Sequence, residues 1–132
     1  MERVIFACVH NAGRSQMAAA FFNQLASREK ATAVSAGTEP AARVHSIVIE
    51  AMKEAGLDLS AALPQRLTTD FARGAALLIT MGCGDQCPVV PGLARADWPL
   101  ADPKDRPLTE VRHIRDTIRE RVAALVRERD WT

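Results

Sequence analysis

Cys8 and Arg14 enclose a short loop whose residue types suit the binding and attack of a tetrahedral oxyanion. Backbone N–H groups converge on an anion where such a loop leads into a helix, and the helix dipole adds positive potential. A guanidinium such as that of Arg14 can hold two oxyanion oxygens at once. The same surroundings favour the thiolate of Cys8, which is the nucleophilic form of a cysteine. The expected oxyanion-binding residues are Val9, His10, Asn11, Ala12, Gly13, Arg14 and Ser15.

Three small or polar side chains in the loop have their own physical reasons to be there. Ser15 can donate a hydrogen bond to the Cys8 thiolate, and Gly13 admits close approach of backbone. Asn11 tolerates left-handed dihedral angles and can bond loop backbone. The competing interpretation is a buried cysteine at a strand end and an exposed arginine at a helix start. The strand before the loop and the helix after it favour the functional interpretation.

The elements around the loop follow from hydrophobic patterning. Residues 3–8 contain an unbroken apolar run typical of a buried parallel strand, and Met17, Phe21 and Leu25 then recur one helical turn apart. Further strands are predicted at residues 31–36, 75–80 and 96–98. Helices are predicted from the apolar stripes in residues 44–55, stopped by Gly56, and in residues 109–129, with a short turn capped by Thr68 or Thr69.

Strands that alternate with helices predict an α/β fold. We expect one domain over residues 1–132, built as a three-layer sandwich with a four-stranded parallel sheet flanked by helices. The loops that leave the carboxyl ends of parallel strands share one edge of the sheet. The segment after the third strand, with Cys83 and Cys87, should therefore lie near Cys8.

Composition narrows the class of protein. The chain has 132 residues, 48% hydrophobic and 25% charged, with a net charge of +1 and no basic cluster, so a nucleic-acid partner is not expected. No apolar run has the length of about 20 residues that spans a bilayer, and a cytoplasmic, monomeric protein is expected. Three cysteines fit a disulfide framework poorly, which makes reduced, chemically active thiols the better interpretation.

The chain resembles the low-molecular-weight protein tyrosine phosphatase fold over nearly its whole length, and within it the thiol-dependent arsenate reductases. The Arg-Ser-Gln-Met wording at residues 14–17 is similar to the reductases, whereas the phosphatases usually carry Arg-Ser-Pro. The motifs that carry the resemblance are His10-Asn11-Ala12-Gly13-Arg14-Ser15-Gln16-Met17-Ala18, Ser35-Ala36-Gly37, Glu50-Ala51-Met52, Cys87-Pro88 and Asp102-Pro103.

This resemblance implies reduction of arsenate to arsenite as a detoxifying activity, with phosphate or sulfate as competing oxyanions. Asp102 matches the general acid that a leaving oxygen requires, in preference to Asp97 or Asp105. Cys83 would be the second thiol and Cys87 the third, passing a disulfide to thioredoxin. A second route, with mycothiol or glutathione and a glutaredoxin-type protein as the external reductant, stays open. No bound cofactor is expected.

The same residues also admit a phosphatase, a binding module or a metal site as interpretations. A phosphatase would let water resolve the Cys8 intermediate, but the chain has no tyrosine, whereas the phosphatases typically flank their pocket with aromatic residues. A non-enzymatic oxyanion-binding module would not need Cys8, Arg14 and Asp102 together. No metal is expected, because the three cysteines lack a well-spaced fourth zinc ligand and Ala19 stands where many reductases carry a glutamate linked to potassium.

Overall fold

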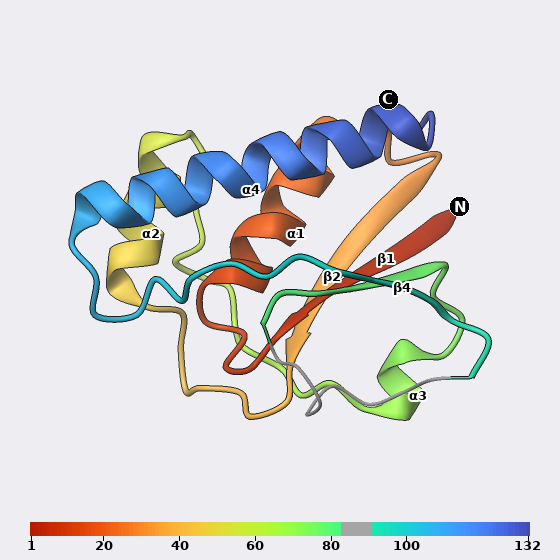
Figure 1. Ribbon diagram of the computed structural model, residues 1–132, viewed down its shortest axis with the longest axis horizontal. Coiled ribbons are helices and arrows are strands. Elements are labelled where there is room, and N and C mark those ends of the chain that lie inside the picture. The colour runs from red at the N-terminus through yellow and green to blue at the C-terminus, as the bar shows by residue number, and fades with distance from the viewer. Residues whose placement is uncertain (83–90) are drawn as a thin grey trace.

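The computed structural model describes residues 1–82 and 91–132 and contains a parallel sheet of four strands in the order β2-β1-β3-β4 (Figure 1). This confirms the predicted α/β architecture. The strands are β1 (Glu2–Cys8), β2 (Ala31–Gly37), β3 (Leu77–Thr80) and β4 (Ala94–Asp97). The helices are α1 (Arg14–Leu25), α2 (Ser46–Glu54), α3 (Thr69–Ala72) and α4 (Leu108–Glu128).

Strand β1 lies at the centre of the sheet and brings Cys8 to its carboxyl edge. Residues 4–8 are buried, because β2 and β3 flank the strand and both faces of the sheet are covered. Cys8 is in register with Gly37 of β2, and Ala7 is in register with Thr80 of β3. Val9, Thr38 and Met81, the residues that directly follow β1, β2 and β3, therefore leave the sheet at the same edge, as the sequence predicted.

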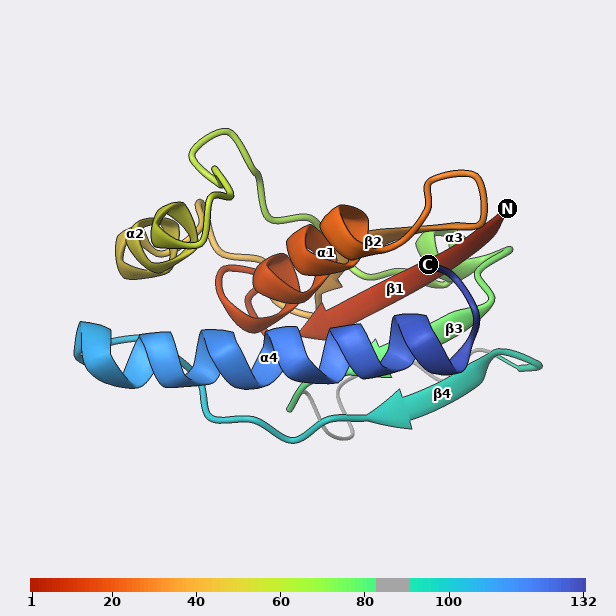
Figure 2. The same cartoon turned by 90° about the horizontal axis from the view of Figure 1, so that it is seen from above.

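Helices α1 and α4 cover one face of the sheet, and α2 packs against α4 on the same side, beyond the ends of the strands (Figure 2). Phe6 points into this layer, where its ring centroid lies 6.0 Å from that of Phe22 and 5.8 Å from that of Trp98. Burial of each such side chain contributes roughly 1.5–3 kcal/mol. The predicted stripe of α4 is confirmed by its buried residues, which include Val111, Ile114, Ile118, Val122 and Leu125.

The opposite face of the sheet has a smaller cover. Ile5, Ala7 and Leu78 pack there against Ala72 of α3 and against Leu67. Leu67 ends an irregular segment, residues 57–67, that we call the strap. The strap joins the end of β2 through two backbone hydrogen bonds, from the Gly37 N–H to the Gln65 carbonyl at 2.8 Å and from the Leu67 N–H to the Gly37 carbonyl at 2.8 Å.

Three helix ends show how hydrogen bonds and backbone conformation set the boundaries of elements. Helix α2 begins at Ser46, later than the apolar stripe suggested, because His45 is extended and its N–H donates to the Ala12 carbonyl at 3.0 Å. Gly56 ends that helix with φ +84°, as predicted, and the Leu57 N–H reaches back to the Met52 carbonyl at 3.0 Å. The Thr68 hydroxyl caps α3 by accepting from the Phe71 N–H at 3.0 Å.

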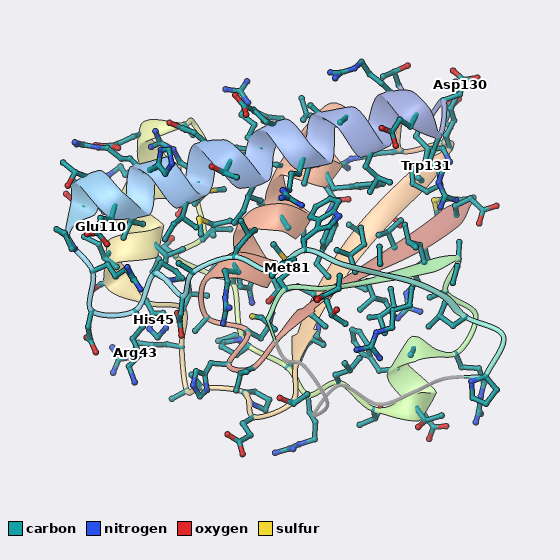
Figure 3. All side chains as sticks on the ribbon, in the orientation of Figure 1. Arg43, His45, Met81, Glu110, Asp130 and Trp131 are labelled. Atoms are coloured by element: carbon teal, nitrogen blue, oxygen red, sulfur yellow. The ribbon has the colours of Figure 1, made fainter. Side chains whose placement is uncertain are left out.

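Trp131, near the last residue of the sequence, packs into the helical layer. Trp131, after α4, packs its ring 5.7 Å from that of Phe22, and its carbonyl accepts from the Ser27 N–H at 2.7 Å. Figure 3 labels this tryptophan beside the end of α4. None of the helices in the described ranges is both long enough and apolar enough to cross a bilayer.

Candidate active site

The thiol of Cys8 ends the central strand and is 2% exposed. Its Sγ lies 2.9 Å from the Ser15 Oγ, which belongs to the first turn of α1. The Asn11 Nδ2 donates to the same Ser15 oxygen at 2.7 Å. Because Ser15 accepts that bond, its own hydroxyl hydrogen is left to point at the Cys8 sulfur, which is the direction that stabilises a thiolate.

The loop between β1 and α1 has all its carbonyl groups held from outside. Backbone N–H groups of Thr38, Glu39, Ala41, His45 and Met17 donate to the carbonyls of residues 8, 9, 10, 12 and 13 at 2.8–3.2 Å. The remaining carbonyl, of Asn11, accepts from a side chain of α1.

The N–H groups of residues 9–15 differ from the carbonyl groups of the loop, because they lack hydrogen-bond partners among the residues that the structure describes. Within the described parts of the chain they donate to no protein acceptor. Helix α1 also begins without a side-chain cap. Buried N–H groups normally find an acceptor, so this set of donors matches an oxyanion seated over Cys8.

Asn11 gives the loop its turn. It has φ +50°, in the left-handed region that asparagine tolerates, and its side chain is completely buried. The backbone N–H of Gln65 in the strap donates to the Asn11 Oδ1 at 2.9 Å. A backbone N–H can only donate, so this contact favours the orientation in which the Asn11 Nδ2 faces Ser15.

Arg14 lies buried beside the loop, with 8% of its side chain exposed. Its Nη1 donates to the Leu100 carbonyl at 3.0 Å, and its Nη2 lies 3.8 Å from the Asp102 Oδ2. Its Nε is buried and has no partner in the described structure. Gly82 has φ +99°, and a Cβ built there would collide with the Arg14 Nη1, so this glycine makes room for the guanidinium. An oxyanion would complete the hydrogen bonding of Arg14.

Asp102 reaches the loop from the segment before α4. Its carboxylate is 42% exposed, and its Oδ1 accepts from the Lys104 N–H at 3.0 Å. Pro103 packs so closely on the loop that a Cβ at Gly13 would lie 2.7 Å from its Cγ. Asp97, at the end of β4, accepts a hydrogen bond from the Thr80 hydroxyl at 2.7 Å.

His10 belongs to the loop, and the backbone of His45 is hydrogen-bonded to it. The His10 ring bonds the Glu39 carbonyl at 3.1 Å. Burial lowers the pKa of His45, and the nearby Asp102 carboxylate only partly opposes this effect. His45, which Figure 3 labels near the start of α2, is therefore neutral at neutral pH and adds no charge to the site.

The predicted thiols Cys83 and Cys87 lie outside the described residues. Sequence reasoning missed two other features of the site: the Leu100 carbonyl that holds Arg14, and the contacts of the strap with Asn11. Neither has a local sequence signal, because each joins residues more than 50 positions apart. In the described ranges, no group of three histidine, cysteine or acidic side chains is arranged to hold a metal ion.

A buried thiol, followed by a loop whose N–H groups have no acceptor in the described structure and by a buried guanidinium, is typical of enzymes that attack tetrahedral oxyanions with a cysteine. The sequence model of the low molecular weight phosphotyrosine protein phosphatase family matches residues 3–130. The chain belongs to this family, which confirms the resemblance predicted from its motifs.

Several proteins of similar sequence are named as arsenate reductases. A provisionally named arsenate reductase of Halobacterium salinarum is 39% identical over 127 residues, covering 93% of this chain and 89% of the relative. The glutaredoxin arsenate reductase of Synechocystis is 34% identical over 129 residues, covering 96% of this chain and 97% of the relative.

A solved structure extends the comparison. The thioredoxin-dependent arsenate reductase of Corynebacterium glutamicum superposes with a TM-score of 0.82 at 39% identity, over 97% of this chain. The present chain spans 61% of the length of that protein, which is less than two thirds.

Proposed function

We propose that this protein reduces arsenate to arsenite, with Cys8 as the nucleophile. The observation that carries the proposal is the loop after Cys8, in which every carbonyl accepts a hydrogen bond, whereas the N–H groups of residues 9–15 and the Arg14 Nε have no partner among the residues that the structure describes. The names of the related proteins support arsenate as the oxyanion.

The first step forms a bond between Cys8 and arsenic. The thiolate attacks arsenate held by the loop N–H groups and Arg14, an As–O bond breaks, and Asp102 gives a proton to the departing oxygen, which leaves as water. The 3.8 Å separation of the Arg14 Nη2 and the Asp102 Oδ2 supports the proposal that acid and guanidinium act on the same oxyanion. Arsenic remains in the +5 state in this thiol-arsenate adduct.

The second step reduces arsenic. A second thiolate attacks the Cys8 sulfur, the electron pair of the S–As bond passes to arsenic, and arsenite leaves with arsenic in the +3 state. The two sulfurs are oxidised to a disulfide, so the two electrons balance. We propose Cys83 as the attacking thiol and Cys87 as the thiol that moves the disulfide outward to thioredoxin. Such a chain of thiols operates in a reducing compartment, and we place it in the cytoplasm.

The alternative reductant is a small thiol, glutathione or mycothiol, regenerated by a glutaredoxin-type protein. In that route Cys8 is the sole essential cysteine. The comparisons include one relative named for glutaredoxin and one described as thioredoxin-dependent, and each name applies to that protein only.

One assay tests the function and its reductant. Arsenite formation is measured with purified protein and arsenate in three parallel systems, containing thioredoxin with its reductase, glutathione with glutaredoxin, or the corresponding mycothiol system. Turnover with thioredoxin that disappears in Cys83→Ser and in Cys87→Ser supports the internal relay. Turnover only with a small thiol, unaffected by these two variants, supports the alternative.

The matched control is Cys8→Ser, which should abolish arsenite formation in every system while phosphate still binds in the loop. Arsenite formation by Cys8→Ser would contradict the proposed mechanism. A wild-type protein that forms no arsenite in any system, but hydrolyses phosphate monoesters, would instead assign it the phosphatase activity of the family.

A further inference from the structure

Gln16 has no part in the chemistry described so far, yet it is one of the few polar side chains buried beside the loop. It lies in the first turn of α1 and is 7% exposed. Its Nε2 faces three oxygens, the Asn11 carbonyl at 3.1 Å, the Asn11 Oδ1 at 3.2 Å and, more weakly, the Leu63 carbonyl of the strap at 3.4 Å. A buried amide that meets only acceptors has its donor end fixed there.

These contacts determine the direction of a chain of hydrogen bonds that ends at the thiol. Gln16 and the Gln65 N–H both donate to the Asn11 Oδ1, so the Asn11 Nδ2 must face Ser15. Ser15 then accepts from Asn11, and its hydroxyl hydrogen turns to the Cys8 sulfur. If the Asn11 amide were reversed, Ser15 would donate to Asn11 and Cys8 would lose that hydrogen bond.

We infer that Gln16 is a positioning residue, which holds Asn11 in its left-handed conformation and orients its amide so that Ser15 donates to the Cys8 thiolate. Gln16 touches neither the oxyanion loop's N–H groups nor Cys8, and it acts through Asn11. This role also accounts for the glutamine at a position where a proline, which has no side-chain donor, could not make these bonds.

The reactivity of Cys8 toward iodoacetamide measures this effect without arsenate. Trypsin releases residues 4–14 as one peptide, which holds Cys8 and neither of the other two cysteines, so mass spectrometry reports the modification of Cys8 alone. At fixed neutral pH, Gln16→Met should slow alkylation of Cys8 by about three- to tenfold, the scale of one ordinary hydrogen bond, because Gln16 reaches the thiol only through Asn11 and Ser15.

Gln16→Glu keeps the shape of the side chain but replaces the donor by an acceptor. Its carboxylate would favour the reversed Asn11 amide, so it should slow alkylation more than Gln16→Met does. The inference would be overturned if Gln16→Met slowed alkylation more than Gln16→Glu does, or if both variants were alkylated at the wild-type rate.

Asn23 supplies a matched control on the same helix. Its side chain donates to the Ala33 carbonyl at 3.0 Å and accepts from the Ala33 N–H at 2.8 Å, away from the loop. Asn23→Leu should lower the melting temperature while leaving Cys8 alkylation unchanged. If Asn23→Leu slowed alkylation as much as Gln16→Met, the effect of Gln16 would be general destabilisation and the inference would fail.

A double-mutant cycle tests whether Gln16 acts through Asn11. In an Asn11→Ala background, Gln16→Met should have no further effect on the alkylation rate, whereas independent action would make the two factors multiply. A kinetic arm rests on the proposed function: kcat for arsenite formation should fall with the alkylation rate, while inhibition by phosphate stays within about twofold. If wild-type protein makes no arsenite, the alkylation results still decide the role of Gln16.

Discussion

At the scale of single residues, the site is organised by which groups can only donate and which can only accept. The Gln65 N–H and the Arg14 guanidinium are obligatory donors, and the Leu100 carbonyl is an obligatory acceptor. The Asn11 amide and the Ser15 hydroxyl, which can do either, take their direction from these neighbours. The result is a site in which donors face the position of the oxyanion before any substrate arrives, so little reorganisation is needed on binding.

Asp102→Asn tests the acid at this scale. An amide cannot give a proton to the departing oxygen, so arsenite formation should fall by about 10²-fold or more, the range of general acid catalysis. The measurement is kcat with saturating arsenate.

Asp105→Asn is the control, because Asp105 has φ +60°, a conformation that asparagine tolerates equally well. It should keep near wild-type turnover. Equal losses in the two variants, or no loss in Asp102→Asn, would remove Asp102 from its role.

At the scale of elements, the loop is held by segments distant in sequence. The residues after β2 hold its carbonyls, the strap bonds Asn11, and the segment before α4 lays Pro103 against Gly13. These segments, two of which follow β2 and β4, meet the loop where β1 ends. The parallel sheet therefore acts as the frame that brings these segments together, and Asp102 is placed by packing as much as by charge.

Gly13→Ala tests this packing. The added Cβ would lie 2.7 Å from the Pro103 Cγ, so the segment of Asp102 must move. We expect arsenite turnover to fall by roughly tenfold or more, since small displacements of catalytic groups are costly, and stability to fall by about 1–3 kcal/mol.

Two further variants separate the causes. Pro103→Ala removes the colliding atoms, so the double variant should recover part of the lost turnover. Gly56→Ala, at φ +84° with open space around it, should lower the melting temperature but leave the turnover of folded protein intact. A Gly13→Ala enzyme as active as wild type would show that Pro103 does not place Asp102.

At the scale of the whole molecule, an ion cluster on the surface joins α2 to α4. Glu54 accepts two hydrogen bonds from Arg112, at 2.9 Å and 2.6 Å, and one from Arg115 at 3.0 Å. The hydrogen bond from Arg112 is the main reason that the pKa of Glu54 is lowered to about 2. Arg115 also donates to the Ala51 carbonyl at 2.8 Å, near the end of α2.

The lowered pKa predicts how acid acts on the fold. A carboxyl whose pKa is lower in the folded state stabilises that state above its unfolded pKa, near 4.5 here, and the contribution is lost as the pH falls towards about 2. Glu54→Gln should therefore melt a few degrees lower at neutral pH, and this difference should shrink below pH 4.5 and vanish near pH 2. Thermal melts across this range test it.

The difference should also be small in high salt, because the cluster is exposed and screened. Asp58→Asn is the control for a carboxyl with a lowered pKa that makes no contact with α4, since its main partner is Ser60. A Glu54→Gln difference that stays constant from pH 7 to pH 2 would contradict the linkage.

The sequence by itself determined the fold class and the core of the site, because both depend on patterns between near neighbours. The apolar run of β1, the small residues after it and the helical period of α1 lie within 25 residues, and they predicted the loop that joins Cys8 to Arg14. Prediction from the sequence was less exact at the ends of elements. The start of α2 is one example, because a long-range hydrogen bond from the His45 N–H to the Ala12 carbonyl decides that boundary.

Only the tertiary structure decided which groups surround that loop. Arg14 meets the Leu100 carbonyl across 86 positions, and Gln65 meets Asn11 across 54. No periodicity marks such pairs, since they depend on the order of strands in the sheet and on the paths of irregular segments. The loop of the proposed nucleophile Cys8 is therefore encoded locally, whereas the direction of its hydrogen bonds and the position of the proposed acid Asp102 come from packing between distant segments.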